Sequence, residues 1–394
     1  MSLSIPPKTM RIEAFDTLFF RDGKPFDRGD TATGSVTFPP APSVFHGALR
    51  TAYFAQQPAA FKANQARNGQ IDRMTDSLRL TSVCLHDGHT ALFPVPHDLV
   101  IEKKHRKDAY VSPHRLSLAA RPAVSSLPSG LHTFRANSEE TMVGAGAYRI
   151  KQADLLDYLN GEALDYARLT ALSNFYSTEQ KVGIGRDPRS GSVREGQLYF
   201  VNFIRPVNSA RTTLRFELGY QARWEKPLED KGYLRLGGEG KSAHYQHTDA
   251  ASTMPPIMIT GKTLRLYLAT PAYFREGWLP QWIDRQTLEG NYELADGTNI
   301  RVRLCAAATD RPLHVGGFDQ RRNRPKPMRR LVPAGSVYYL TCDSVEEAQM
   351  LTDALHGNCL SDPELSPDAK TSPSDYYRQR GFGIVYCGNS YANE

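Results

Sequence analysis

The sequence predicts an α+β fold of two domains, and three observations support this prediction. The chain has 394 residues, a length at which a single hydrophobic core usually stops growing. Hydrophobic residues make up 40% of it, which is enough to build ordinary globular cores. Strand-like and helix-like segments also follow one another in a similar order twice. We expect one domain at 1–250 and a second at 259–394.

The first domain begins with a strand and a helix. The segment 10–20, MRIEAFDTLFF, is rich in apolar and aromatic residues and predicts a strand. After a polar turn, Ser43 is placed to cap a helix, because its hydroxyl can accept a hydrogen bond from a free N–H of the first turn. The apolar residues on one face of that helix are Phe45, Leu49 and Tyr53.

Two more strands follow, over 78–87 and 89–96. They are joined across Asp87-Gly88, a dipeptide that favours a tight hairpin turn. The order strand, helix, strand, strand opens a ferredoxin-like (RRM-like, β-α-β-β-α-β) unit. From 97 to 150 the pattern loosens into a basic stretch with Ser, Pro and Gly, which we interpret as an insertion.

The remaining elements complete both domains. The first continues with a helix at 151–160, an extended β-hairpin at 179–200, and strands at 199–207 and 213–224. After a linker at 251–258, the second has strands at 262–271, 299–309 and 335–342 and a helix at 279–290. A helix at 344–357 begins at Ser344, with Glu347 in capping-box position, and a mobile surface loop follows at 360–375. The predicted fold is therefore two ferredoxin-like domains with insertions and an extended hairpin.

Charge and cysteine content limit the class of protein. Lys and Arg outnumber Asp and Glu by 48 to 42, an excess that permits a polyanionic partner without requiring one. The five cysteines are widely spread and form no C-x-x-C pair, so neither a disulfide scaffold nor a zinc site is indicated. The pairs His86/His89 and His244/His247 lack further matching metal ligands. We expect a cytoplasmic protein without a membrane span, metal or cofactor.

The loop at 19–30 carries Arg21, Lys24 and Arg28 among turn residues. It precedes the helix at Ser43, whose free N–H groups and positive dipole end favour an anion. Loop and helix together can therefore hold a phosphate. The alternative, that Ser43 only caps its helix and the cations are solvated, fits the spacing equally well.

Two further segments concentrate positive charge. The hairpin at 179–200 has a glycine-rich tip with three arginines, which can lie along an RNA backbone or serve only solubility. The loop at 321–330, RRNRPKPMRR, has six cations and no acid, which favours a phosphate partner, because like charges repel one another without counter-charge. The predicted RNA-binding residues are Arg186, Arg189 and Arg194 in the hairpin, and Arg321, Arg322, Arg324, Lys326, Arg329 and Arg330 in the loop.

Near the end of the chain, Gly381 and Gly383 flank Phe382. Glycines let backbone N–H groups approach a phosphate chain, and the phenyl ring can stack on a base. A tight turn before a last strand explains the same residues. We include all three in the predicted RNA-binding set.

The sequence contains no P-loop, G-x-S-x-G or H-E-x-x-H motif. His46, on the first helix, is the candidate acid or base if the chain cleaves RNA, but a lone histidine is more often a polar contact or a packed ring. We assign His46 to RNA binding, with Ser43 and Arg50 on the same helix.

Five stretches together resemble one family. They are TLFFRDGKPF (17–26), FPPAPSVFHGALRTA (38–52), VGIGRDPRSGSVREGQLYF (182–200), LGGEGKSA (236–243) and PKPMRRLVPAGSVYYL (325–340). In this order, and over most of the chain, the sequence resembles the third subunit of the Cmr-type (type III-B) CRISPR effector complex, in the RAMP superfamily.

The resemblance implies two packed ferredoxin-like domains that bind the 5′ repeat-derived tag of a guide RNA (crRNA) in antiviral defence. It also implies docking against the large polymerase-like subunit and the repeated backbone subunit of the complex, with no nuclease activity in this chain. Two other functions stay open. One is a metal-independent RAMP endoribonuclease that processes precursor guide RNA, with His46 as acid or base, and the other is a scaffold that only bridges proteins.

Overall fold

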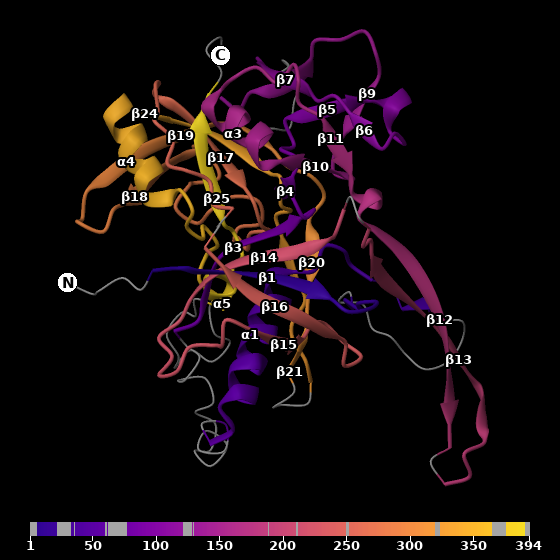
Figure 1. The fold of residues 1–394 in the computed structure, drawn as a ribbon. Helices are drawn as coiled ribbons and strands as arrows, with labels where there is room; N and C mark the ends of the chain where they lie inside the picture. Colours follow the sequence, from indigo (N-terminus) through magenta and orange to yellow (C-terminus); the bar gives the residue numbers. More distant parts are fainter. Residues whose placement is uncertain are drawn as a thin grey trace.

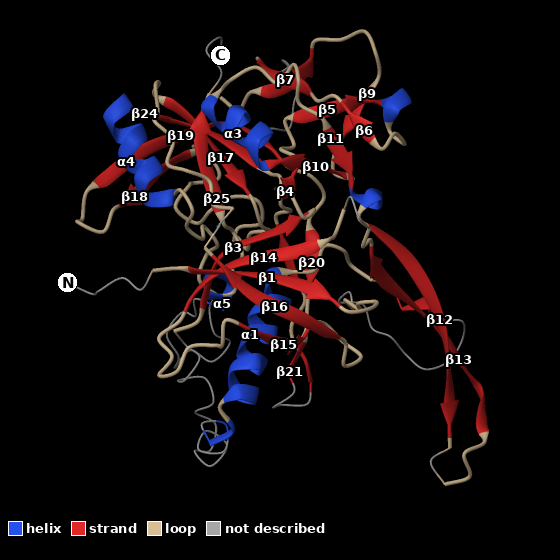
Figure 2. Cartoon of the chain, in the orientation of Figure 1, coloured by secondary structure: helices blue, strands red, loops and turns tan. Residues whose placement is uncertain are grey.

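Strands make up most of the fold, and helices are few. The computed structural model describes residues 6–21, 33–34, 36–59, 61, 77–120, 128, 130–187, 189–209, 212–249, 252–319, 324–364 and 376–390. The elements form a body of packed sheets with helices on its outside, and one long β-hairpin projects away from the body (Figures 1 and 2). The predicted mixture of α and β structure is confirmed, with strands as the larger part.

One large sheet holds the first strand in its interior. Within the described residues, its nine strands lie in the order β15-β16-β1-β14-β3-β4-β10-β11-β6. Strand β1 pairs antiparallel with β14 on one side and β16 on the other, and it ends earlier than the predicted strand at 10–20. The strands are β1 (Lys8–Ala14), β3 (Arg79–His86), β4 (Ala91–Pro94), β6 (Tyr110–Val111), β10 (Tyr148–Lys151), β11 (Leu169–Ala171), β14 (Arg215–Gln221), β15 (Lys231–Arg235) and β16 (Ser242–Thr248).

Helix α1 (Pro42–Gln56) covers one face of this sheet (Figure 1). The predicted apolar face is confirmed, since Phe45, Leu49 and Tyr53 are at most 3% exposed and share a core cluster with residues of β1 and β14. The predicted cap at Ser43 is wrong. The N-cap position is Ala41 and no side chain caps the helix, because Pro42, which has no N–H to satisfy, occupies the first turn instead.

The turn between β3 and β4 is the predicted one. Oδ1 of Asp87 accepts hydrogen bonds from the backbone N–H groups of His89 and Thr90, both at 2.8 Å, and Gly88 has φ +100°. The helix predicted at 151–160 is also confirmed, as α3 (Gln152–Asn160).

The stretch predicted as an insertion is partly one. Four of its strands form a separate sheet in the order β8-β7-β5-β9, while β6 and β10 extend the large sheet. The separate strands are β5 (Leu99–Glu102), β7 (His114–Ala119), β8 (Thr133–Ala136) and β9 (Met142–Gly144), and the 3-10 helices η1 (Lys103–His105) and η2 (Leu172–Asn174) lie nearby in the chain.

The C-terminal sheet has the strand order β18-β19-β24-β17-β25. Helix α4 (Val345–Leu355) begins where predicted, and Oγ of Ser344 accepts a hydrogen bond of 3.1 Å from the N–H of Glu347. The strands are β17 (Thr263–Leu268), β18 (Glu289–Glu293), β19 (Asn299–Ala308), β24 (Val337–Cys342) and β25 (Val385–Asn389). Two short pairs, β20 (Leu313–Val315) with β23 (Arg329–Leu331) and β21 (Phe318–Asp319) with β22 (Arg324–Pro325), precede α5 (Tyr376–Gln379).

The helix predicted at 279–290 is wrong. Oδ1 of Asp284 accepts hydrogen bonds from the N–H groups of Gln286 (2.9 Å) and Thr287 (2.8 Å), and such bonds compete with helical ones. Leu288 then adopts φ +61°, and the chain enters β18. The segment is therefore a turn.

The larger hydrophobic cluster crosses the predicted domain boundary. It includes Phe93 of β4 and Tyr386 of β25, whose ring centroids lie 6.1 Å apart. The buried Asp98 carboxylate also accepts hydrogen bonds from Tyr158 of α3 and Tyr339 of β24, each at 2.7 Å. Both parts of the chain thus share a core, and the division at 251–258 stays a prediction.

Candidate nucleic-acid interface

Three segments far apart in sequence meet at the start of α1. Ala41, just before the helix, packs against a small cluster of Leu331 from β23, Tyr377 from α5 and Phe382. The structure therefore brings together the helix, the end of the basic loop and the C-terminal glycine segment, each of which the sequence marked as a candidate RNA contact.

His46 lies inside this junction. It is 6% exposed, its imidazole hydrogen-bonds to the backbone of Leu78, and its Nε2 has no hydrogen-bond partner in the described part of the chain. Burial, with the positive charges of Arg380, Arg50 and Lys326, lowers the pKa of His46 to about 3. The ring is therefore neutral near pH 7, and three cations are near enough to lower its pKa.

Tyr376 organises two of these cations. The guanidinium carbon of Arg380 lies 3.5 Å from the centroid of the tyrosine ring, and Nη1 of Arg380 donates a 3.1 Å hydrogen bond to its backbone oxygen. Nζ of Lys326 donates to the tyrosine hydroxyl at 3.0 Å. We call His46, Arg50, Lys326, Tyr376 and Arg380 the cationic cluster. Aromatic contacts of this kind fix where the charges are held.

Two other cations of the basic loop, Arg329 and Arg330, do not belong to the cationic cluster. Arg329 forms an ion pair with Glu364, with both its Nε and Nη2 3.1 Å from Oε1. That charge is already compensated within the chain, so Arg329 is a weaker candidate for a phosphate contact. Arg330 is exposed and lies opposite His314 in the β20–β23 ladder.

The C-terminal glycine segment serves packing. Phe382 is fully buried, and its ring meets Tyr377 edge to face at 5.4 Å, so the predicted stacking of Phe382 on a base is wrong. The N–H of Gly381 bonds to Arg378 and that of Gly383 to Pro271, so neither offers its donor to a phosphate. A Cβ on Gly383 would lie 2.7 Å from Ser361 N, which explains the glycine there.

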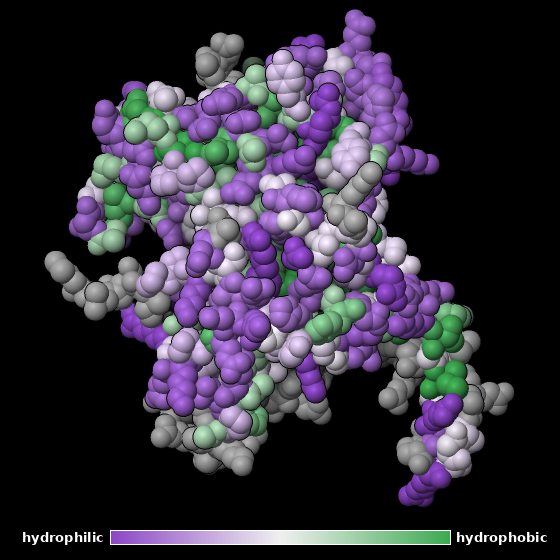
Figure 3. Space-filling model, viewed as in Figure 1, coloured by the Kyte–Doolittle hydropathy of each residue, from purple (hydrophilic) through white to green (hydrophobic). Residues whose placement is uncertain are grey.

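The predicted hairpin is confirmed as β12 (Tyr176–Arg186) and β13 (Val193–Pro206), with the short β2 (Thr33–Gly34) beside β13. It extends far from the body (Figure 1). Arg186, the last residue of β12, and Arg189, in the turn that follows, are exposed. Its shaft also shows apolar surface (Figure 3), where Val182 is 61% exposed. The arm thus combines cations with exposed apolar side chains.

Of the remaining predicted RNA-binding residues, only some are described by the structure. Arg21 is exposed and forms an antiparallel β-bridge with Val36. Ser43 lies half-buried within α1. Lys24, Arg28, Arg321 and Arg322 lie outside the described residues, as do the side chains of Arg194 and Arg324.

Sequence reasoning missed Tyr376. Its signal was present in the run DYYRQR, where two tyrosines lie within four residues of two arginines. Over the described ranges, no three His, Cys, Asp or Glu side chains are grouped so as to hold a metal ion. No described helix is both long and apolar enough to cross a membrane.

Comparison with known proteins places these features in context. A family model described as CRISPR-associated protein (Cas_Cmr3) matches residues 10–390. A chain of the type III-B Cmr-beta complex bound to cognate target RNA and AMPPnP is 13% identical, with 96% of each chain covered and a TM-score of 0.51, so the two share a fold. A chain of Cmr-beta bound to cognate target RNA is 14% identical over 84% of this chain and 86% of that one, with a TM-score of 0.47. No curated protein matches the sequence.

Proposed function

Since the chain belongs to the Cas_Cmr3 family of CRISPR-associated proteins, we propose that it is the non-catalytic RNA-binding subunit of a cytoplasmic type III-B effector complex. In this role it holds the 5′ repeat-derived tag of the guide RNA. The observation that carries the proposal is the cationic cluster, where Arg50, Lys326 and Arg380 come from three distant segments and act together on one buried histidine, whose pKa their charges lower.

The cluster suits a phosphate chain. Phosphate contacts set the position and register of a bound nucleic acid, and cations held by an aromatic ring lose little further freedom on binding. Lys326 and Arg380 are both held by Tyr376 in this way. A phosphate of the tag would lie between them.

The neutral state of His46 favours binding over cleavage. A general acid must carry its proton near pH 7, and a pKa of about 3 leaves the ring almost wholly unprotonated there. Its Nε2 is also buried, away from any substrate. We therefore assign His46 a positioning role beneath the cations, and the observation counts against the endoribonuclease alternative.

The strand order supports two ferredoxin-like units. In the large sheet β1 lies between β16 and β14, with β3 beyond, and in the C-terminal sheet β17 lies between β25 and β24, with β19 beyond. Each first strand thus pairs with both the third and the fourth strand of its unit. Within the described part of the chain, the first unit contains the helix α1 and the second contains the helix α4.

The complex supplies the remaining partners. The chain shares its fold with a chain of Cmr-beta, a complex solved with target RNA. We propose that this chain docks against the large polymerase-like subunit and the repeated backbone subunit, and that the projecting β12–β13 arm lies along the guide RNA.

Guide binding by the assembled complex tests the proposal. The variant is Lys326→Glu with Arg380→Glu, and the matched control is Arg285→Glu, an exposed arginine in the turn before β18. The cluster variant is expected to lower affinity for the tagged guide about 10-fold or more, because two phosphate contacts become repulsive. Equal affinities in normally assembled complexes would contradict the proposal.

A further inference from the structure

Two aromatic rings lie exposed on the large sheet, away from the cationic cluster. Phe15, just after β1, is 63% exposed, and Tyr233 on β15 is 70% exposed. Their ring centroids are 5.6 Å apart, and His244 on β16 lies 5.8 Å from Tyr233. Exposed rings gathered in this way are a mark of an interaction site.

The strand registers place Tyr233 and His244 on the sheet face opposite α1. Successive side chains of a strand point to opposite faces, and their neighbours Leu234 and Ala243 are buried in the core beneath α1. Cys84 on β3 points to this same face, opposite α1, and is buried in the core shared with the C-terminal sheet. The face is therefore covered at β3 and open at β15.

The side chains around the rings are polar. Lys231 and Arg235, both exposed, lie two residues to either side of Tyr233 and so share its face. Gln246 lies opposite Lys231 on β16. An unpaired nucleotide needs a ring for its base and cations for its phosphates, and this face offers both.

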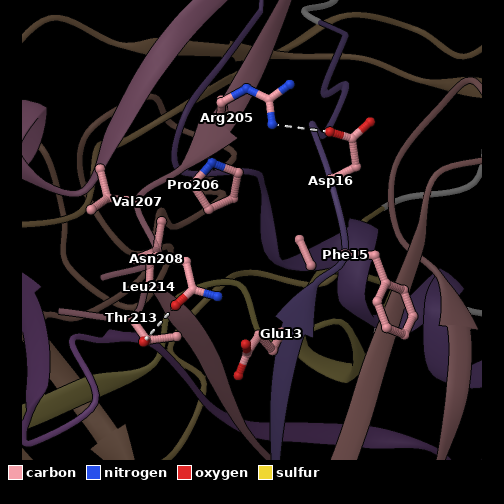
Figure 4. A pocket seen from close by; sticks show the side chains of 10 residues that line it. Glu13, Phe15, Asp16, Arg205, Pro206, Val207, Asn208, Thr213 and Leu214 are labelled. Atoms are coloured by element: carbon pink, nitrogen blue, oxygen red, sulfur yellow. Dashed lines mark hydrogen bonds and ion pairs between the residues drawn. The ribbon is translucent and has the colours of Figure 1, made fainter. Parts of the chain in front are cut away.

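A pocket adjoins Phe15. Figure 4 shows Phe15, Asp16, Arg205 and Asn208 around it, together with Glu13. Nη1 of Arg205 bonds to Oδ1 of Asp16 at 3.1 Å, and Oδ1 of Asn208 accepts from Thr213 at 3.1 Å, which leaves the Asn208 amide nitrogen as a donor. The pocket therefore offers both donors and acceptors beside an aromatic ring, as the edge of a base requires.

We propose that Phe15 and Tyr233 form a stacking platform for one unpaired nucleotide of single-stranded RNA, with Lys231 and Arg235 on its phosphates and the adjoining pocket on its base edge. The inference rests on the proposed function only in taking RNA as the ligand. It adds a second RNA contact, on the sheet face opposite α1.

Binding of a short oligouridine and of a blunt RNA duplex to the full chain tests the platform. Tyr233→Leu and, separately, Phe15→Ala are compared with Tyr233→Phe, which keeps a ring, and with Tyr166→Ala, which removes a tyrosine that is 95% exposed elsewhere. We expect the first two to lower oligouridine affinity about 5- to 100-fold, with duplex binding unchanged. Tyr233→Phe and Tyr166→Ala should bind as the wild type does.

The outcomes separate this proposal from the previous one. If the Lys326→Glu, Arg380→Glu variant loses affinity for the tagged guide while Tyr233→Leu and Phe15→Ala keep wild-type affinity for oligouridine, the platform is overturned and the cluster stands. If no variant loses affinity, both proposals fail. If the Tyr233 and Phe15 variants bind oligouridine normally but no longer assemble with the other subunits, the face is a protein interface and the platform is overturned.

Discussion

The guanidinium carbon of Arg380 lies 3.5 Å from the ring centroid of Tyr376, and the hydroxyl of the same tyrosine accepts a hydrogen bond from Lys326. One aromatic side chain thus holds two cations from segments more than 50 residues apart in the sequence. The fold therefore sets the distance between the two charges. Substituting both residues tests their joint contribution to RNA binding.

Charge reversal in the isolated chain should change the salt dependence of RNA binding. Each lost phosphate contact lowers the slope of log affinity against log salt by about 0.7 for a single strand. Lys326→Glu with Arg380→Glu should therefore flatten the slope by about 1 to 2, measured by fluorescence anisotropy across a salt series. Arg285→Glu serves as the control, and parallel lines for wild type and cluster variant would exclude these residues as phosphate contacts.

Acid should destabilise the fold partly through His46. Its pKa is about 3 in the folded chain against an ordinary value of 6.5, so as pH falls below about 6.5 the unfolded chain binds a proton that the folded chain does not. The free energy of unfolding should therefore fall between pH 7 and pH 4. His46→Gln should make that fall smaller in urea titrations at several pH values. An identical pH profile in the variant would show that the ring is not buried as described.

The two serines predicted as caps should differ when replaced by alanine. Ser344 accepts a hydrogen bond from Glu347, and its loss should cost about 1 kcal/mol. Ser43 caps nothing, so Ser43→Ala should change stability by less than about 0.5 kcal/mol. Chemical denaturation of both variants provides the comparison, and a larger loss at Ser43 would contradict the helix start at Pro42.

The buried Asp98 carboxylate should be a stabilising link between the two parts of the chain. Tyr339→Phe removes one of its donors and should cost about 1–3 kcal/mol, because a buried carboxyl oxygen then loses a hydrogen bond. Tyr166→Phe, at a position that is 95% exposed, is the control. Equal stability of the two variants in denaturant would argue that Asp98 is solvated.

Local patterns in the sequence predicted local structure well. The Asp87-Gly88 turn, the apolar face of α1, the β12–β13 hairpin and the Ser344 cap depend on residues close together in the chain, and the structure contains each. The prediction of a helix at 279–290 was wrong because the Asp284 side chain competes for backbone N–H groups. The spacing of apolar residues gives no sign of this competition.

The candidate site could not be predicted from local sequence patterns, because it depends on contacts between segments far apart in the chain. Phe382 looked available for stacking, yet tertiary packing buries it against Tyr377. Tyr376 and His46 gain their roles only when α1, the basic loop and α5 meet. The exposure of Phe15 and Tyr233 likewise follows from where the C-terminal sheet ends over the large sheet.

Crosslinking in the assembled complex tests whether this chain holds the 5′ tag of the guide RNA. A guide RNA with a single photoreactive uridine in its 5′ tag is bound, irradiated and digested, and the crosslinked peptides are identified by mass spectrometry. A second guide, with the same nucleotide at its 3′ end, is the control. We expect the tag uridine to crosslink to peptides of this chain from α1, from 324–331 or from 376–383, and the 3′ uridine not to do so. Crosslinks from the tag to other subunits alone would contradict it.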